Sequence, residues 1–357
     1  MGHKFSSLPN DNLVGMEFRV EELAKLLHLE SSNKVRVFGI SGMGGIGKTT
    51  LVRALYERIA HQYDFTCYID DVNQIYRDSS TLGVQKQLLS HSLNQEYQEI
   101  CNVSEGTSLL WKRLRHKKAL IVLDNVDEVE QLKIFTGNRD TMLRECLGGG
   151  SIIIIISRDE QILRIHEVDD VHQVQPLEND EALELFCRHA FKGNVIMSDF
   201  EQMAHQVLWH AQGHPLAIEV LGSSLFGLNV SQWKSALAVL RENKRKKILD
   251  VLRISFEALD YTNKEIFLDI SCLLYNYQVE HAVEILNVRG FYPDHGLQVL
   301  INKSLLFVED GRIKMHGLLI DLGRSIVREV SPKEPRNWSR VWSGEDLQKV
   351  LSTNMVQ

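Results

Sequence analysis

A glycine-rich segment that ends in Lys48 and Thr49 holds the residues with the clearest chemistry in this sequence. Residues 42–49 fit the spacing G-x-x-x-x-G-K-T, in which glycines let the backbone fold closely around phosphate oxygens. The lysine ammonium in this pattern reaches the β- and γ-phosphates of a nucleotide, and the threonine hydroxyl ligates Mg²⁺. The candidate phosphate-binding residues are Gly42, Gly44, Gly45, Ile46, Gly47, Lys48, Thr49 and Thr50.

The residues on either side place this segment between a strand and a helix. Residues 35–40 form a short apolar run typical of a buried strand, and Leu51, Leu55 and Ile59 recur at helical spacing. The first backbone N–H groups of that helix, at its positive dipole end, would face a bound anion. The alternative is an ordinary glycine-rich turn, which needs neither these flanks nor the Lys-Thr pair. The segment therefore predicts a nucleotide phosphate site.

Asp124 is the candidate for the acidic group that such a site requires. It ends the apolar run 119–124, and a carboxylate in that place holds Mg²⁺ between the β- and γ-phosphates, usually through water. A strand-end aspartate that caps a turn is the alternative. Because ligands bind at the carboxyl ends of parallel strands, we expect residues 42–49, Asp124 and Arg158 at one edge of the sheet. The next residue, Asn125, cannot accept a proton as a carboxylate can, so hydrolysis of the nucleotide is left in doubt.

Length and composition indicate an ordinary globular chain of more than one domain. Its 357 residues are 44% hydrophobic and 24% charged, values usual for soluble proteins. The formal net charge of −7 offers no global attraction to nucleic acid or to an anionic membrane. No apolar run approaches the roughly 18 residues of a membrane span. The five cysteines are far apart and form no C-x-x-C pair, which favours reduced thiols in the cytoplasm.

The alternation of strand and helix patterns predicts a P-loop α/β domain over residues 13–175, with a parallel sheet and helices on both faces. Five consecutive isoleucines within 151–157 indicate a central strand that is covered on both sides. A helical domain is expected over 176–243, and helices followed by a hairpin around Glu309-Asp310-Gly311 predict a winged helix over 244–330. We expect a linker at 1–12 and a tail at 331–357. The apolar patterns also predict a strand at 65–69 and helices at 20–27, 82–93, 183–191, 200–210, 215–226, 231–241, 248–259 and 264–274.

Other motifs leave weaker alternatives. The start Met1-Gly2 followed by Ser6 fits the loose N-myristoylation pattern, and the basic cluster 243–247 leaves nuclear import open beside a solvated start of the next domain. His210 and His214 have the spacing of metal ligands on a helix, but Gly213 and Pro215 interrupt that helix. No G-x-S-x-G element suggests a serine nucleophile, and the guanine signature N-K-x-D is absent.

With these motifs in place, the chain from about Leu13 to Arg340 resembles the nucleotide-binding NB-ARC region of plant disease-resistance receptors of the TIR class. The resemblance implies a P-loop domain, a helical ARC1 domain and a winged-helix ARC2 domain, in agreement with the segments above. It rests on an ordered series of motifs: Leu13-Val14-Gly15, Gly42 to Thr50, Leu120-Ile121-Val122-Leu123-Asp124-Asn125-Val126-Asp127, Ser157-Arg158-Asp159, Gly213-His214-Pro215-Leu216-Ala217, Phe267 to Cys272 and Met315-His316-Gly317-Leu318-Leu319.

The resemblance also implies roles for single residues. Val14 would lie against the adenine, Arg158 would sense the γ-phosphate, Pro215 would pack on the base, and His316 would contact the β-phosphate of ADP. In this family, ADP holds a closed, inactive form, and exchange for ATP permits an open form that forms oligomers. The expected partners are an adenine nucleotide with Mg²⁺ and the TIR and leucine-rich-repeat domains of a longer receptor. Motifs of those two domains do not occur in these residues, so a truncated receptor or an excised fragment is expected.

Three departures from the family pattern affect the expected function. Asn125 stands where a second aspartate is usual, which predicts slow hydrolysis at most. Ile152 and Ile156 replace a usual arginine and threonine. Gly317 replaces the aspartate of the Met-His-Asp motif, which predicts a weaker ADP-bound closed form. Three hypotheses therefore stay open: a nucleotide-dependent signalling switch, a working ATPase, and a scaffold that does not depend on nucleotide.

Overall fold

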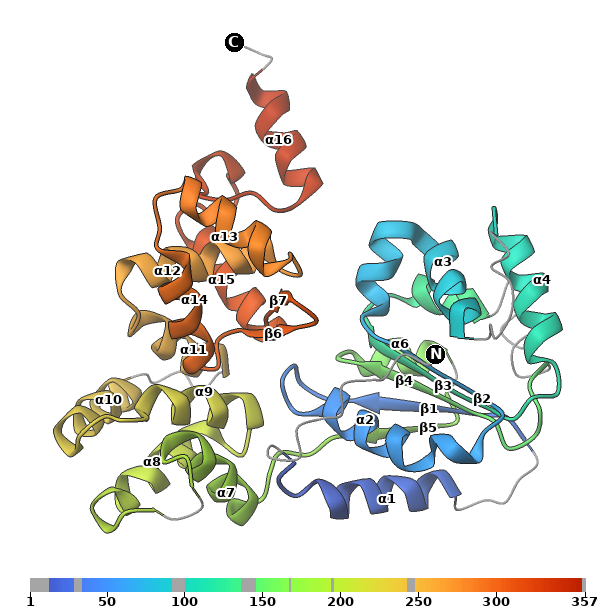
Figure 1. Cartoon of the computed structure of the whole chain (residues 1–357), viewed down its shortest axis with the longest axis horizontal. Coiled ribbons are helices and arrows are strands. Elements are labelled where there is room, and N and C mark those ends of the chain that lie inside the picture. Colours follow the sequence, from blue (N-terminus) through green and yellow to red (C-terminus); the bar gives the residue numbers. More distant parts are fainter. Residues whose placement is uncertain are drawn as a thin grey trace. The chain divides into compact units, whose positions relative to one another are not determined.

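The computed structural model describes residues 13–28, 34–91, 100–135, 146–166, 168–193, 196–242 and 248–354. They belong to two compact units, divided between Gln175 and Pro176 (Figure 1). The expected linker 1–12 with Gly2 and the basic cluster 243–247 lie outside the described residues. The predictions of myristoylation and of nuclear import therefore stay predictions.

The first unit is a five-stranded parallel sheet in the order β2-β3-β4-β1-β5, flanked by helices. The predicted P-loop α/β fold is thus confirmed. In chain order the elements are α1 (Met16–His28), β1 (Arg36–Ser41), α2 (Lys48–Ile59), the short helix η2 (Ala60–Gln62), β2 (Phe65–Ile69), α3 (Val72–His91), α4 (Val103–Leu114), β3 (Ala119–Val126), η3 (Val129–Phe135), β4 (Ile152–Ser157), α6 (Glu160–Ile165) and β5 (Asp170–Gln173).

Alternation along the central strands gives this sheet two apolar faces. In β4 the even-numbered isoleucines from Ile152 to Ile156 pack with α1 and α2, whereas Ile153 and Ile155 pack with α3, α4 and α6. Figure 1 shows α1 and α2 on one face of the sheet and α3 and α4 on the other. All six residues of β4 are buried, as the unbroken β-branched run predicts for a strand covered on both sides.

The second unit is helical, with one two-stranded hairpin. Its first helices enclose an aromatic cluster of Phe186, Phe191, Phe200 and Trp233, whose neighbouring rings lie 4.9–6.4 Å apart. The elements are α7 (Asn179–Ala190), η4 (Ser198–Phe200), α8 (Glu201–Ala211), α9 (Pro215–Leu225), α10 (Val230–Glu242), α11 (Ile248–Glu257), α12 (Tyr261–Asp269), the π-helical turn η5 (Ile270–Leu274), α13 (Val279–Val288), α14 (Pro293–Asn302), β6 (Phe307–Glu309), β7 (Arg312–Lys314), α15 (Gly317–Glu329), η6 (Pro335–Asn337) and α16 (Gly344–Asn354).

The predicted hairpin is confirmed. Strands β6 and β7 pair antiparallel, and Asp310 and Gly311 between them both have positive φ, as a tight hairpin turn requires. Together with α12 to α15 they form the winged helix. Its core is continuous with α9, because Leu216 and Val220 belong to the same buried cluster as Leu252 and Phe267.

Residues after α15 are tied to the winged helix by a buried arginine. The Arg340 side chain is 1% exposed; its Nε donates to Asp269 Oδ1 over 2.6 Å and its Nη2 donates to Glu265 Oε2 over 2.7 Å. Asp269, also buried, accepts a further hydrogen bond from Arg289. The indoles of Trp338 and Trp342 stack 5.3 Å apart beside Arg328. A side chain that enters the core in this way fixes the segment to α12.

Candidate functional site

The glycine-rich loop lies between β1 and α2, as predicted, and its glycines adopt conformations that other residues rarely reach. Gly42 has φ 143° and Gly47, which caps α2, has φ 98°. A Cβ at Gly42 would also come within 3.2 Å of Ile46 Cγ2. The loop is thus a cradle that larger residues would distort, with the N-terminus of α2 at its end, and this arrangement suits an anion.

Lys48 is held inside this loop. Its side chain donates from Nζ to the carbonyl oxygens of Gly42 at 2.7 Å and Met43 at 2.8 Å, and the residue is only 8% exposed. Burial lowers the pKa of Lys48 to about 8, with a further decrease from the nearby Arg158 and an opposing increase from Asp124. Burial and a second cation nearby both disfavour the charged form of the ammonium. A phosphate anion bound beside Lys48 would stabilise that charged form.

Asp124 lies at the carboxyl end of β3 beside the loop. The residue is 6% exposed, and its carboxylate is hydrogen-bonded to the Thr49 side chain and accepts from the Tyr68 hydroxyl at 3.1 Å. Burial raises the pKa of Asp124, and the hydrogen bond with Thr49 opposes that effect. A hydroxyl and a carboxylate in contact are the oxygen donors that Mg²⁺ prefers. The donors present therefore fit a nucleotide phosphate with its magnesium ion.

The structure thus brings together Lys48, Thr49, Asp124 and Arg158. Lys48 and Arg158 interact electrostatically, as do Lys48 and Asp124. Val14 is buried just before α1, and Ile46 is buried within the loop. Thr50 is half-buried in the first turn of α2.

Pro215 and His316 belong to the second unit. Pro215 is the first residue of α9, after the capping residue His214. His316 caps α15, lies 5.4 Å from the Phe307 ring and is close enough to His214 for an electrostatic interaction. The motifs around Pro215 and His316 are therefore neighbours within this unit, although about a hundred residues separate them.

The sequence-based search did not identify Tyr68, Asp70 or Asp71 as residues of the site. Tyr68 holds Asp124, Asp70 pairs with Arg53 at 2.6 Å, and Asp71 accepts from the Asn125 amide. All three come at the carboxyl end of β2, which pairs with β3. Two aspartates directly after a buried strand are a sequence pattern that could have identified Asp70 and Asp71. Ligands bind at the carboxyl ends of all parallel strands, so the rule that selected Asp124 applies to the end of β2 as well.

Other predicted chemistry finds no counterpart in the described part of the chain. His210 lies on α8 and His214 caps α9, and no group of three or more His, Cys, Asp or Glu side chains among the described residues could hold a metal ion. The five cysteines are free thiols. None of the described helices combines the length and hydropathy needed to cross a membrane.

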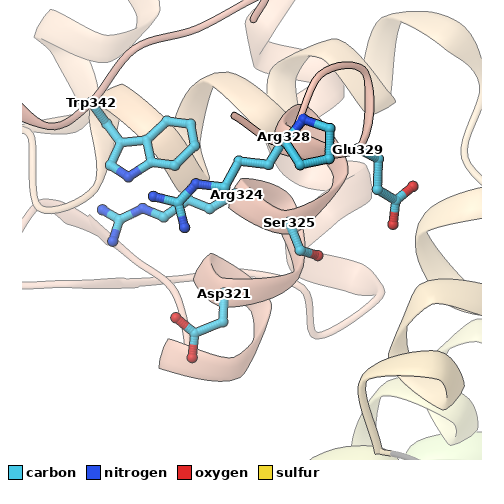
Figure 2. A pocket seen from close by; sticks show the side chains of 7 residues that line it. Asp321, Arg324, Ser325, Arg328, Glu329 and Trp342 are labelled. Atoms are coloured by element: carbon cyan, nitrogen blue, oxygen red, sulfur yellow. The ribbon is translucent and has the colours of Figure 1, made fainter. Parts of the chain in front are cut away.

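A cavity of about 390 Å³ occurs in the second unit, on α15 (Figure 2). Figure 2 shows the guanidinium groups of Arg324 and Arg328 beside the indole of Trp342. Side chains of both charge signs line it, and none of the predicted site residues is among them. The lining residues are Asp321, Arg324, Ser325, Arg328, Glu329, Pro332 and Trp342. It is therefore a weaker candidate for a phosphate site than the glycine-rich loop.

Comparison with known families supports the same interpretation. Residues 16–196 match the NB-ARC domain, and residues 260–331 match the winged-helix domain described as disease resistance protein Roq1-like. The chain is 36% identical over 342 residues to disease resistance protein RUN1 of Vitis rotundifolia, covering 96% of this chain and 25% of that protein. It is 35% identical over 351 residues to TMV resistance protein N of Nicotiana glutinosa, covering 96% and 30%. The chain thus spans less than a third of these relatives.

Among solved structures, the chain is similar to a signal transduction ATPase with numerous domains (STAND) from Pyrococcus horikoshii, which has a tetratricopeptide repeat sensor. The TM-score is 0.50 at 16% identity, and the match covers 88% of this chain and 43% of that one. At this identity the similarity concerns the fold alone.

Proposed function

This chain belongs to the NB-ARC family, and on that basis we propose that it binds ADP and ATP with Mg²⁺ and acts as a nucleotide-dependent switch of a plant immune receptor. The observation that carries the proposal is Lys48, a buried ammonium within the glycine-rich loop, next to the Thr49–Asp124 pair and near Arg158. No other chemistry suggested by the sequence gathers a comparable set of donors.

In this proposal the loop and Lys48 bind the phosphates, and Thr49 and Asp124 hold Mg²⁺, which neutralises phosphate charge when it is bound. Val14 packs on the adenine and Arg158 detects the γ-phosphate. Pro215 packs on the base and His316 contacts the β-phosphate of ADP, so that ADP favours a closed form, and exchange for ATP permits an open form that assembles with further copies. The TIR and leucine-rich-repeat domains of a longer receptor are the partners that would supply signal output and sensing. Hydrolysis is slow, because Asn125 replaces an acidic residue.

The experiment that tests nucleotide binding is to denature the purified chain and identify the released nucleotide by ion-pair chromatography with mass detection. About one equivalent of ADP or ATP is expected, and Lys48→Ala should carry much less. Ligand at ~100 times its dissociation constant adds about 2.7 kcal/mol of stability, so excess ADP should raise the melting temperature of the unsubstituted chain but not that of Lys48→Ala. A chain that carries no nucleotide and melts at the same temperature in excess ADP would leave only the scaffold hypothesis.

The switch itself is tested at Gly317. This residue is the first of α15, whose first turn contains no acidic side chain, and an aspartate there would stabilise the helix and hold the neighbouring His316. A charge-assisted hydrogen bond contributes about 1.5–3 kcal/mol, so Gly317→Asp should slow ADP release by roughly 10- to 150-fold. Release of a fluorescent ADP analogue measures the effect, and equal or faster release would contradict the proposed closed form.

A further inference from the structure

Two polar residues beside the candidate site are held in an unusual arrangement. Asp71 follows β2, Asn125 lies near the end of β3, and the Asn125 amide donates from Nδ2 to Asp71 Oδ1 over 2.6 Å. Both residues have positive φ, 50° for Asp71 and 58° for Asn125. Left-handed backbone at two non-glycine residues that share a hydrogen bond costs free energy and tends to occur where function fixes the geometry.

A bulge in β3 accounts for the direction of Asn125. The pairing of β3 with β4 shifts register between Leu123 and Val126, so Asp124 and Asn125 occupy the irregular part. Bulges re-aim side chains and are common beside active sites. The backbone N–H of Asn125 donates to Asp124 Oδ1 over 2.8 Å, which ties it to the carboxylate that contacts Thr49. Asn125 is therefore fixed through its backbone to Asp124 and through its side chain to Asp71.

The charge of Asp71 decides which way the Asn125 amide faces. An ionised carboxylate only accepts hydrogen bonds, so the amide must present Nδ2 to Asp71, and its Oδ1 remains as an acceptor. Without Asp71, either end of the amide could take either position. Asp71 is also half-buried and accepts from the backbone N–H of Gln74 at 3.4 Å. The pair thus presents one oriented acceptor next to Asp124.

We propose that Asp71 is a positioning residue for ATP hydrolysis, acting through Asn125. This rests on the proposed nucleotide function. Asn125 Oδ1 accepts a hydrogen bond from the attacking water and orients its oxygen toward the γ-phosphorus, a role that amide side chains can fill. The water oxygen forms a bond to phosphorus, the bond to the β–γ bridging oxygen breaks with its electron pair left on ADP, and the water proton passes to the released phosphate. Asp71 keeps the amide in the productive orientation.

The test measures single-turnover ATP hydrolysis and ADP affinity on the same purified chains. Displacement of a reacting group by about 1 Å costs about 100-fold in rate, so we expect Asp71→Ala and Asn125→Ala each to slow hydrolysis by 10- to 100-fold. Affinity for ADP should stay within about twofold. Because Asp71 acts through Asn125, the double variant should be no slower than Asn125→Ala. Asp71→Glu retains an acceptor-only carboxylate and should recover at least threefold over Asp71→Ala.

Asp127 offers a matched control at the same end of β3. It is an exposed aspartate that accepts from the side-chain amide of Gln131 and lies 3.6 Å from Arg77. Asp127→Ala removes the same charge and should change the rate by less than about twofold.

Several results would overturn the inference. The first is an Asp71→Ala variant that hydrolyses ATP at the rate of Asp127→Ala. The second is a double variant in which the rate losses of the two single variants multiply. The third is an unsubstituted chain that binds ATP but hydrolyses it no faster than Lys48→Ala. A chain that binds no nucleotide fails the proposed function instead, and the affinity measurement identifies that case.

Discussion

Raising the pH should weaken nucleotide binding through Lys48. Burial, aided by Arg158, lowers the pKa of this ammonium from 10.5 to about 8 in the ligand-free fold. A phosphate that pairs with Lys48 would stabilise the charged form and return its pKa toward the ordinary value. A pKa difference of about 2.5 corresponds to about 3 kcal/mol, or roughly 300-fold in affinity, between the two pH limits.

The sign follows from where protons are bound. Below pH 8 the ammonium is charged in both the free and the bound protein, so affinity is constant. Above pH 8 the free protein loses a proton that the complex retains, and the dissociation constant rises up to tenfold per pH unit until about pH 10.5. At pH 9 we expect binding about tenfold weaker than at pH 7, with uptake of nearly one proton. The phosphates of ADP do not obscure this, since their last pKa lies near about 6.

Isothermal titration calorimetry with Mg²⁺-ADP at pH 7 and pH 9, in two buffers of different ionisation enthalpy, measures both quantities. Lys48→Arg is the control, because a guanidinium keeps its charge over this range and its affinity should not vary with pH. An unsubstituted chain whose affinity is equal at both pH values would refute the reasoning. So would a Lys48→Arg variant with the same slope, since another group would then be responsible.

Three further predictions concern the second unit. Burial, with Lys192 and Arg188 nearby, lowers the pKa of His189 to about 4, so below pH 6.5 the unfolded chain binds a proton that the fold excludes. The free energy of unfolding should therefore fall by about 1–3 kcal/mol as the pH decreases from 6.5 to 4, and His189→Gln should flatten that dependence in urea titrations. Arg340→Met should lower the free energy of unfolding by about 3 kcal/mol. This is at the low end for a broken buried ion pair, because Arg289 still pairs with Asp269. Gly323→Ala should cost about 1–3 kcal/mol, since the new Cβ would lie 2.1 Å from Ser271 Oγ, whereas Gly344→Ala meets no atom within 4 Å and should be neutral in thermal melts.

Each of these has a result that contradicts it. An unchanged acid slope in His189→Gln would assign the titration to another residue. Full additivity of Asp269→Asn with Arg340→Met would show that the two side chains are not energetically coupled. Equal melting temperatures for the two glycine variants would mean that α15 can shift away from Ser271 without cost.

The parts of the fold that sequence predicts well are those with a strong local pattern. Residues 65–69 and the isoleucine run of β4 were predicted as strands, because continuous β-branched and aromatic residues leave few alternatives. By contrast, α3 begins at Val72, ten residues before the predicted start, and Ser80 within it has φ 52°. Val72, Ile75 and Tyr76 have helical spacing, but they cover little more than one turn, and the polar residues 77–81 follow them before the next apolar residue. The predicted helix 264–274 changes to a π-helical turn at Ile270, where tertiary packing decides the hydrogen-bond spacing.

For the site, the sequence predicted the residues that lie on motifs or at the ends of apolar runs. The candidates Lys48, Thr49, Asp124 and Arg158 were selected in this way. Asp71 could have been selected by the same rule, since it follows a buried strand, but its contact with Asn125 and that of Tyr68 with Asp124 depend on β2 being the neighbour of β3 in the sheet. Strand order is a property of the whole domain, and no local pattern in β2 reveals it.

Arg340 also has a mechanical consequence. Tension applied to the chain beyond Trp342 would not reach the winged helix along α15 alone. It would be carried by the Arg340 guanidinium into Glu265, in the middle of α12, and into Asp269, at the end of α12 where the π-helical turn begins. A displacement of the segment after Trp342 would therefore act on Asp269, a buried residue in the interior of the winged helix.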